Sequence, residues 1–547
     1  MSDDLSLFAQ LKKRHVFRVG AMYLVGAWIL LQFGEIMIDL MDLPRWTGRA
    51  LILLLALGFP FILILAWVFD ISTKGLVRGT GQLDAKDHQI ASRKIDLAII
   101  VALVIALALS FFVLRNPIEI DDDSSLISEP DLADAPISNE PRDAYGDQYI
   151  LVGNLVDFTG SSGDSGQTYG QAIIDSANWI NENGGINGKL IDLDTIETSY
   201  LVRRALRAFD KWSTENLVAI QGWGTAIGIA LKGQITQNNI PYFSASYAAE
   251  FTDPLGLNTD TPAPYNFFYG PSYSDGCRGL VQWAHEDWLI RTTNKPAKFI
   301  HMGDNQPYPN APKDACAVYA ASLGFEVLPS IVFSMVPGDF SRQCATLKAS
   351  EADYVFLANL DKSVSSLLTQ CQLVGVKSQY MANIWGFDES VMRSAGIAAD
   401  GVVWVMGAAA WPDTHPGMYT VREVSKMSDP EQTKYRPVHY MRGVCSMFYL
   451  KEAMEIADQS GILSGPSIKS AMYLSKDWVP EGLEGVCLPA TWSNGDHRGI
   501  ARVLVYQAQV REEALGRSME TLIDLGVIRM KQIYEANIPR KSEWLGY

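Results

Sequence analysis

A strand, a glycine-rich turn, a helix and a second strand follow one another between Tyr149 and Asp194, and this order constrains the fold more than any other stretch. The apolar run at 150–156 leads into a turn with glycines at 160, 163 and 166, and apolar residues then recur at helical spacing between 172 and 180. This order is the first unit of a parallel α/β sheet. The helix that follows such a turn presents free backbone N–H groups, which favour an anionic ligand group.

Short apolar runs alternate with helical segments as far as about residue 535. This alternation indicates an α/β fold with a doubly wound parallel sheet covered by helices on both faces. About 390 residues exceed what one such sheet with short connections requires, so we expect two lobes.

Three apolar runs near the start of the chain have the length of membrane spans. They cover residues 20–38, 50–69 and 97–114, and a span needs about 20 residues. Lys and Arg are concentrated before the first run and between the second and third, which predicts a cytoplasmic N-terminus and an exported C-terminus. Because no cleavage site follows the first run, we expect residues 1–115 to be a membrane module of three transmembrane helices that acts as a signal-anchor in a bacterial inner membrane.

Residues 116–148 are rich in Asp, Glu, Ser and Pro, which predicts an acidic disordered linker. The domain after it, residues 149–547, would then be a periplasmic domain tethered to the membrane module by this linker. The net charge of −16 argues against a nucleic-acid partner.

Six cysteines all lie after residue 276, and no two form a C-x-x-C pair, which argues against structural zinc and thioredoxin-like chemistry. In an exported domain one or two disulfides are compatible with this pattern, and so are scattered buried thiols. The sequence leaves the pairing open.

Four stretches, in order along the chain, resemble the type 1 periplasmic substrate-binding proteins of the leucine/branched-chain amino-acid-binding family. They are NENGGINGKLIDLD, IPYFSASYAAEFTDP, YNFFYGPSYSDGCRGLVQWA and ATWSNGDHRG. The resemblance implies two Rossmann-like lobes with a three-stranded hinge and a small ligand clamped between them. It places lobe 1 at about 149–270 and 408–503, and lobe 2 at about 271–407 plus the C-terminal segment. The hinge crossings would fall near Gly270–Ser274, Gly401–Gly407 and Leu504–Gln507. The apolar opening of the chain resembles a membrane module found ahead of various bacterial domains.

The resemblance also implies ligand contacts from lobe 1. Thr225 takes the position of a hydroxyl that grips a ligand carboxylate, and Trp223 and Gly224 lend backbone or an apolar wall. Thr225 also begins a predicted helix, so it could equally be a plain N-cap. The next contact loop contributes three residues, Ser246, Tyr247 and Ala248, the last of which stands where relatives carry threonine. In the glycine turn, Ser165 stands where relatives often place an aromatic residue, which implies room for a bulkier ligand.

From lobe 2, Tyr308 matches a family tyrosine that packs on the ligand. Trp385 and Asp388 lie near the position where amino-acid binders place an acidic partner for the ligand ammonium. A cleft lined by Trp223, Tyr308 and Trp385 suits an amino-acid-like, amide or aromatic carboxylate ligand. For each aromatic residue, a position in the hydrophobic core is the competing interpretation.

No nucleophile, metal or nucleotide motif accompanies this pattern, so we expect no enzyme activity, no metal and no cofactor. His497, in a D-H-x-G stretch, is interpreted as part of a structural turn. Two functions remain. Either the domain delivers a small solute to an ABC-type permease, or it is a ligand-sensing membrane receptor that signals through a partner protein.

Overall fold

The computed structural model describes residues 148–291, 295–512 and 516–547, together with scattered positions between 23 and 78. The chain divides into two compact units, residues 1–137 and 138–547. In the first unit, positions near 23–31 and 51–59 are helical, and the Tyr23 hydroxyl donates a hydrogen bond to the Leu55 carbonyl at 2.8 Å. Two short strands, β1 (Phe69–Ser72) and β2 (Gly75–Arg78), pair antiparallel.

Among the positions that the structure describes, no helix is both long and apolar enough to cross a membrane. Most of the predicted spans at 20–38 and 50–69, the whole of the span at 97–114 and nearly all of the linker at 116–148 lie outside the described residues.

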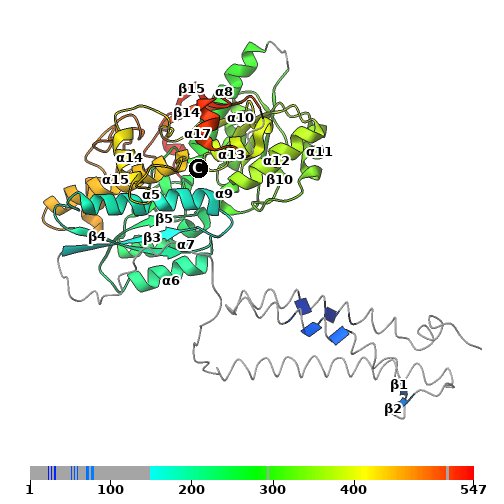
Figure 1. Ribbon diagram of the computed structural model, residues 1–547, viewed down its shortest axis with the longest axis horizontal. Helices are drawn as coiled ribbons and strands as arrows, with labels where there is room; N and C mark the ends of the chain where they lie inside the picture. The colour runs from blue at the N-terminus through cyan, green and yellow to red at the C-terminus, as the bar shows by residue number, and fades with distance from the viewer. Residues whose placement is uncertain are drawn as a thin grey trace, which may run out of the picture. The chain divides into compact units, whose positions relative to one another are not determined.

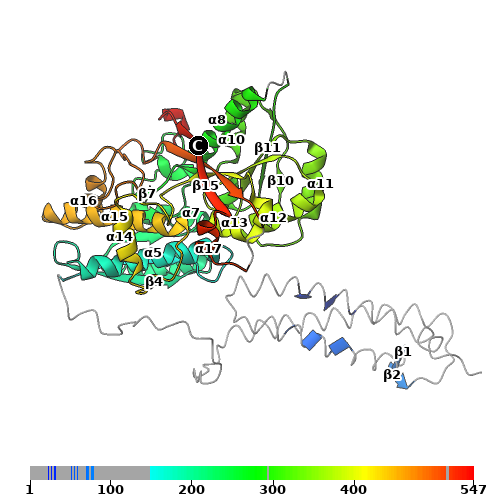
Figure 2. The ribbon, with the colours of Figure 1, turned by 45° about the horizontal axis from the view of Figure 1, so that its top comes forward.

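The second unit contains two sheets (Figures 1 and 2). The first is a five-stranded parallel sheet. Its strands, in spatial order, are β4 (Leu190–Glu197), β3 (Tyr149–Val156), β5 (Leu217–Gly222), β6 (Tyr242–Ser244) and β7 (Asn266–Phe268). Alternate residues of β3 point to opposite faces: Ile150 and Val152 join one apolar cluster with α5, whereas Leu151 and Leu155 join another with α6 and α7.

Helices cover both faces of this sheet, as the sequence predicts (Figure 1). On one side lie α5 (Gly163–Glu182), α14 (Met418–Ser425), α15 (Val438–Gln459) and α16 (Gly465–Ala471), and on the other α6 (Val202–Trp212) and α7 (Thr225–Asn238). A short 3-10 helix, η3 (Ala249–Thr252), lies beside β7. The first sheet with these helices is called the first lobe below.

The second sheet has eight strands and is mixed. Its strands are β10 (Ile331–Val332), β8 (Lys298–Gly303), β11 (Tyr354–Ala358), β12 (Gln379–Ala382), β13 (Val403–Met406), β14 (Arg502–Val510) and β15 (Ile528–Asn537), with β9 (Glu326–Val327) paired to β8. The strands β8 to β13 are parallel, but β14 pairs antiparallel with both β13 and β15. The expectation of a purely parallel sheet is therefore wrong at this edge. The antiparallel strands β14 and β15 are joined at one end of the sheet, so the chain does not have to cross the sheet between them.

The helices of the second sheet are α8 (Tyr273–Ile290), α9 (Pro307–Asn310), α10 (Lys313–Ser322), α11 (Ser341–Ser350), α12 (Asp361–Val374), α13 (Glu389–Ala395) and α17 (Met519–Asp524), with the 3-10 helix η4 (Gly396–Ala399). The sheet with these helices is called the second lobe. The chain passes between the lobes three times: between β7 and β8, after β13, and before β14. The 3-10 helix η5 (Ser542–Trp544) follows β15, and the last residues contact the first lobe, where the Gly546 amide donates to the Thr252 hydroxyl at 3.0 Å.

All six cysteines are paired, as Cys277–Cys316, Cys344–Cys371 and Cys445–Cys487. These disulfides join α8 to α10, α11 to α12, and α15 to the connection before β14. The three pairs exceed the one or two that the sequence suggested.

Candidate functional site

The glycine turn is held by Asp157, which directly follows β3. One carboxylate oxygen of Asp157 accepts from the Gly160 amide at 2.6 Å, and the other accepts from the Ser162 amide at 3.0 Å and the Ser162 hydroxyl at 2.5 Å. A Cβ at Gly166 would lie 2.1 Å from the Asp157 carbonyl oxygen, so this glycine is required by close backbone packing. The turn thereby fixes the start of α5 and the position of Ser165.

Thr225 and Ser246 form the polar end of the first lobe. Their hydroxyl oxygens are 2.6 Å apart and both residues are buried. Gly224, which precedes Thr225, has φ +85° and occupies the N-cap position of α7. Thr225 is therefore the first helical residue, and the interpretation of Thr225 as an N-cap is wrong. Hydroxyls and helix N–H groups thus meet at one point, which favours an anionic group.

Six aromatic side chains gather where the lobes meet, and we call them the aromatic cluster: Tyr169, Trp223, Tyr247, Tyr273, Tyr308 and Trp385. The Trp223 and Trp385 rings are 5.0 Å apart at 71°, and Tyr169 contacts both at 5.5 and 5.6 Å. The Trp223 indole N–H donates to the Ser162 hydroxyl at 2.8 Å, which ties the cluster to the glycine turn. The buried indole nitrogen of Trp385 has no hydrogen-bond partner.

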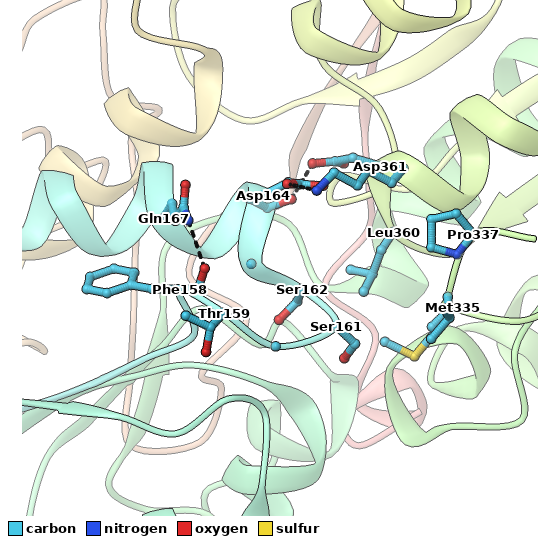
Figure 3. A pocket seen from close by; sticks show the side chains of 15 residues that line it. Phe158, Thr159, Ser161, Ser162, Asp164, Gln167, Met335, Pro337, Leu360 and Asp361 are labelled. Atoms are coloured by element: carbon cyan, nitrogen blue, oxygen red, sulfur yellow. Dashed lines mark hydrogen bonds and ion pairs between the residues drawn. The ribbon is translucent and has the colours of Figure 1, made fainter. Parts of the chain in front are cut away.

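Two cavities lie at this junction. The smaller one, of about 20 Å³, is lined by Trp223, Gly224, Thr225, Tyr308 and Trp385 among others. The larger one, of about 270 Å³, lies between the glycine turn on one side and residues 335–337 and 360–362 on the other (Figure 3). Ser162 and Leu360 line both cavities, so the two adjoin.

The structure places the ten residues predicted for the site at different depths. Five of them line the smaller cavity, and Ser165 lines the larger one. Ser246 lies behind Thr225, and Tyr247 packs on Trp385 with ring centroids 5.6 Å apart. Ala248 and Asp388 are buried and line neither cavity. The Asp388 carboxylate caps α13, where one oxygen accepts from the Ser390 and Val391 amides at 2.8 and 3.0 Å.

Sequence reasoning missed Asp361, His439 and Arg442. Asp361 begins α12 directly after the strand β11, and its carboxylate accepts a hydrogen bond from the Ser165 hydroxyl of the other lobe. Polar residues at the carboxyl ends of parallel strands are the usual position for a ligand contact, and this signal could have identified Asp361. His439 and Arg442 lie three residues apart on α15, and the N-terminal two-thirds of this helix is buried. A histidine and an arginine at this spacing among apolar residues were the sequence signal available for them.

Asp361, Asp388 and His439 are close enough to suggest a metal centre, since one ligand atom from each lies within 4.8 Å of the others. However, Arg442 Nη1 lies 2.8 Å from His439 Nδ1. A guanidinium can only donate, so Nδ1 is the acceptor and the ring hydrogen is on Nε2, the atom that faces the carboxylates. An N–H group is not a metal ligand, so this arrangement does not fit a cation.

Burial dominates the electrostatics of this group. It raises the pKa of the Asp361 carboxyl well above its ordinary value, and the neighbouring Asp388 carboxyl raises it further. Burial also raises the pKa of Asp388 to about 6, against the opposing effect of the backbone hydrogen bonds from Val391 and Ser390. For His439, burial and then the Arg442 charge lower the pKa well below its usual value, so the ring is neutral.

The Arg442 guanidinium stacks on the aromatic cluster. It lies 3.6 Å from the ring centroid of Trp385 and 5.2 Å from that of Tyr247. Nη1 also donates to the Ile384 carbonyl at 3.0 Å, whereas Nε and Nη2 have no hydrogen-bond partner. A fully buried cation therefore stands directly behind one wall of the smaller cavity.

Two lobes, three crossings and a site where the lobes meet define a two-lobed binding protein. Residues 150–514 match the family of periplasmic binding proteins, and the chain belongs to this family. An ABC transporter substrate-binding protein from Aeropyrum pernix is 23% identical with a TM-score of 0.62, and the match covers 73% of this chain and 98% of that one.

Two further solved structures share the fold. A branched-chain amino acid ABC transporter protein from Thermus thermophilus with bound valine is 18% identical, covering 69% of this chain and 99% of that one, with a TM-score of 0.60. A fatty acid ABC transporter substrate-binding protein from Thermomonospora curvata is 17% identical, covering 72% and 95%, with a TM-score of 0.60. No curated protein matches the chain.

Proposed function

We propose that this protein is a membrane-anchored periplasmic solute-binding protein that clamps a small amino-acid-like, amide or aromatic carboxylate ligand between its lobes for delivery to an ABC-type transporter. The observation that carries the proposal is the convergence of the Thr225 hydroxyl and the N-terminus of α7, from the first lobe, with Tyr308 and Trp385, from the second, around one cavity. An anion-binding end and an aromatic wall are what such a ligand requires.

The charges favour an amino-acid-like ligand within this set. A ligand carboxylate would lie at Thr225, where the cation of Arg442 behind Trp385 adds to the attraction. A ligand ammonium or amide N–H would face Asp361, whose Oδ1 is buried without a hydrogen-bond partner at the edge of the larger cavity. Asp361 thus takes the role that the sequence suggested for Asp388.

Binding requires the lobes to move. A cavity of about 20 Å³ is far smaller than the roughly 300 Å³ or more of typical small-molecule sites. A ligand would enter with the lobes apart and stabilise a closed arrangement by contacting both, with the three crossings as the hinge.

Anchoring rests on residues 1–115. Their three apolar runs and the Lys and Arg between them support retention in a bacterial inner membrane with the binding domain in the periplasm. The family to which the chain belongs supports the same location for the domain.

Thermal unfolding of the full chain, measured against panels of amino acids, their amides and aromatic carboxylates, tests the proposal. A ligand at 100 times its Kd stabilises the folded state by about 2.7 kcal/mol, which raises the Tm measurably. We expect at least one class to do so. If no ligand of the three classes raises the Tm, the proposal is ruled out. If a ligand is found, reconstitution with an ABC permease separates transport from sensing.

A further inference from the structure

A buried polar contact joins the two lobes beside the cavities. Asp361 and Asp388 of the second lobe face Ser165 and His439 of the first, and we call these four residues the carboxyl latch. The Ser165 hydroxyl donates to Asp361 Oδ2, and His439 Nε2 lies 3.9 Å from Asp361 Oδ2 and 3.8 Å from Asp388 Oδ2. Asp361 is 6% exposed, Asp388 2% and His439 1%, so the closed arrangement removes all three from water.

No Lys or Arg neutralises the two carboxyls within 4.0 Å in the part of the chain that the structure describes. Lys362, next to Asp361, turns outward to Asp164 at 2.6 Å. Arg442 donates one N–H to His439 and another to the Ile384 carbonyl. The other titratable or charged groups that face the latch from the elements packed against it are Asp164 and Tyr169 on α5, Tyr308 on α9, Glu389 on α13, and Tyr435 before α15.

These neighbours add no compensating charge. Glu389 is itself a buried carboxyl, whose pKa burial raises to about 8, and it accepts from the Tyr435 hydroxyl at 3.2 Å. Tyr169 and Tyr308 are neutral, because burial raises the pKa of each well above its ordinary value. Two adjacent carboxylates, both desolvated and facing a neutral imidazole, are unfavourable unless one of them is protonated.

We propose that closure of the lobes takes up a proton from solvent onto the Asp361–Asp388 pair and that opening releases it, so that acid favours the closed arrangement. The proton binds to a carboxylate oxygen, leaving a carboxylic acid in the latch, and no other bond changes. The inference needs no ligand, so it stands apart from the proposed function.

The direction follows from linkage. With the lobes apart, Asp361 loses the cover of the first lobe and faces water, where an aspartate titrates near its ordinary value of about 4. Asp388 keeps its hydrogen bonds from the Ser390 and Val391 amides, which act to lower its pKa. In the closed arrangement burial raises the pKa of Asp388 to about 6 and raises that of Asp361 as well. A group whose pKa is higher in the closed state stabilises closure below the open-state value, and this contribution is lost as the pH rises through the closed-state value. For one coupled proton, the ratio of closed to open molecules falls up to tenfold per pH unit inside this window.

Single-molecule fluorescence resonance energy transfer between dyes on the two lobes of the full chain measures the ratio of closed to open molecules. All six native cysteines are paired, so thiols introduced by Ile229→Cys on α7 and Leu289→Cys on α8, at exposed positions of the two lobes, take the fluorophores. Without added ligand, we expect the high-transfer population to decrease as the pH is raised from about 5 to about 8.

Asp361→Asn supplies the neutral side chain at every pH, so this variant should stay closed across the range and lose the pH response. Asp210→Asn, which removes an exposed carboxylate on α6, on the opposite face of the first sheet from the latch, should keep the response. If Asp361→Asn does not fold by circular dichroism, Asp388→Asn replaces it, since asparagine also caps a helix. A ratio independent of pH in the wild type, or an unchanged response in the asparagine variant, would overturn the inference. Ligand binding in the thermal assay would be unaffected by that result, so the two proposals fail separately.

Discussion

Trp223 of the first lobe and Trp385 of the second meet edge to face, with ring centroids 5.0 Å apart and planes at 71°. Aromatic pairs in this geometry contribute about 0.5–1.5 kcal/mol beyond the burial of their surface. The lobes are therefore held together by contacts of their own, to which the Ser165–Asp361 hydrogen bond adds. A ligand that enters the cleft displaces part of the contact between the two tryptophan rings. Its affinity therefore depends on how well its own contacts with the two lobes compensate for that loss.

Thr225→Ala should weaken the binding of a carboxylate ligand by about 1–3 kcal/mol, because the ligand loses a hydroxyl contact and Ser246 loses its partner. Isothermal titration calorimetry with a ligand from the thermal panel measures the change. Thr225→Ser, which keeps the hydroxyl, should bind almost as the wild type does. Gln237→Ala, on the exposed face of the same helix, is the matched control. Equal affinity of Thr225→Ala and wild type would remove Thr225 from the site.

Asp361 rather than Asp388 should recognise a ligand ammonium. An amino-acid ligand and the α-hydroxy acid with the same side chain differ at this group, an ammonium against a neutral hydroxyl of similar size, so their affinity ratio isolates the contact. Asp361→Asn should reduce this ratio at least tenfold, since the carboxylate partner of the cation is lost. Asp388→Asn should leave the ratio near the wild-type value, because the Asp388 carboxylate is occupied with the amides at the start of α13. All titrations are made at one fixed pH, so the proton coupling of the latch is the same for both ligands of each pair. The opposite pattern would restore the role predicted for Asp388.

Most of the architecture could be predicted from the sequence, because the apolar periodicity of parallel strands is local. The stretch from Tyr149 to Asp194 forms strand, turn, helix and strand as expected. The antiparallel edge could not be predicted in this way, since β14 and β15 look like any other apolar run until their partner strands are known. The disulfide pairing depends in the same way on contacts between distant residues.

Part of the candidate site could be anticipated from local sequence, and part depends on topology alone. Trp223, Thr225 and Trp385 take positions at which the resemblance implies ligand contacts, and the structure brings them to one cavity. Arg442 and His439 come from a helix more than 200 residues after Thr225 and belong to no local pattern. The sequence pointed to Asp388 for the acidic partner of a ligand, whereas we propose Asp361. Both residues follow a strand, and only the fold shows that Asp388 caps a helix while Asp361 faces the other lobe.

The glycines of the turn are required by packing, and one of them makes a sharp prediction. Gly166→Ala would place its Cβ 2.1 Å from the Asp157 carbonyl oxygen, so the backbone of the turn must shift. We expect a loss of unfolding free energy of about 1–3 kcal/mol, the usual cost of forcing atoms into a packed site. Gly233→Ala is the matched control, because it lies in the interior of α7 with nothing within 4 Å of the added Cβ. That change should stabilise the protein by about 0.4–1 kcal/mol. Urea unfolding of both variants measures the difference, and similar values would contradict this account of the turn.

The Cys344–Cys371 disulfide should contribute to stability through the unfolded chain. It closes a loop of 27 residues between α11 and α12, and the chain-entropy model assigns about 3.6 kcal/mol to such a loop. The double variant with Cys344→Ser and Cys371→Ser should therefore unfold at a lower urea concentration. Thiol titration of the unfolded wild-type chain without reductant should detect no free cysteine, since all six are paired. Reactive thiols mapped to Cys344 and Cys371 in that titration would show that this pair does not form in solution. Equal urea midpoints for variant and wild type would contradict the predicted contribution to stability.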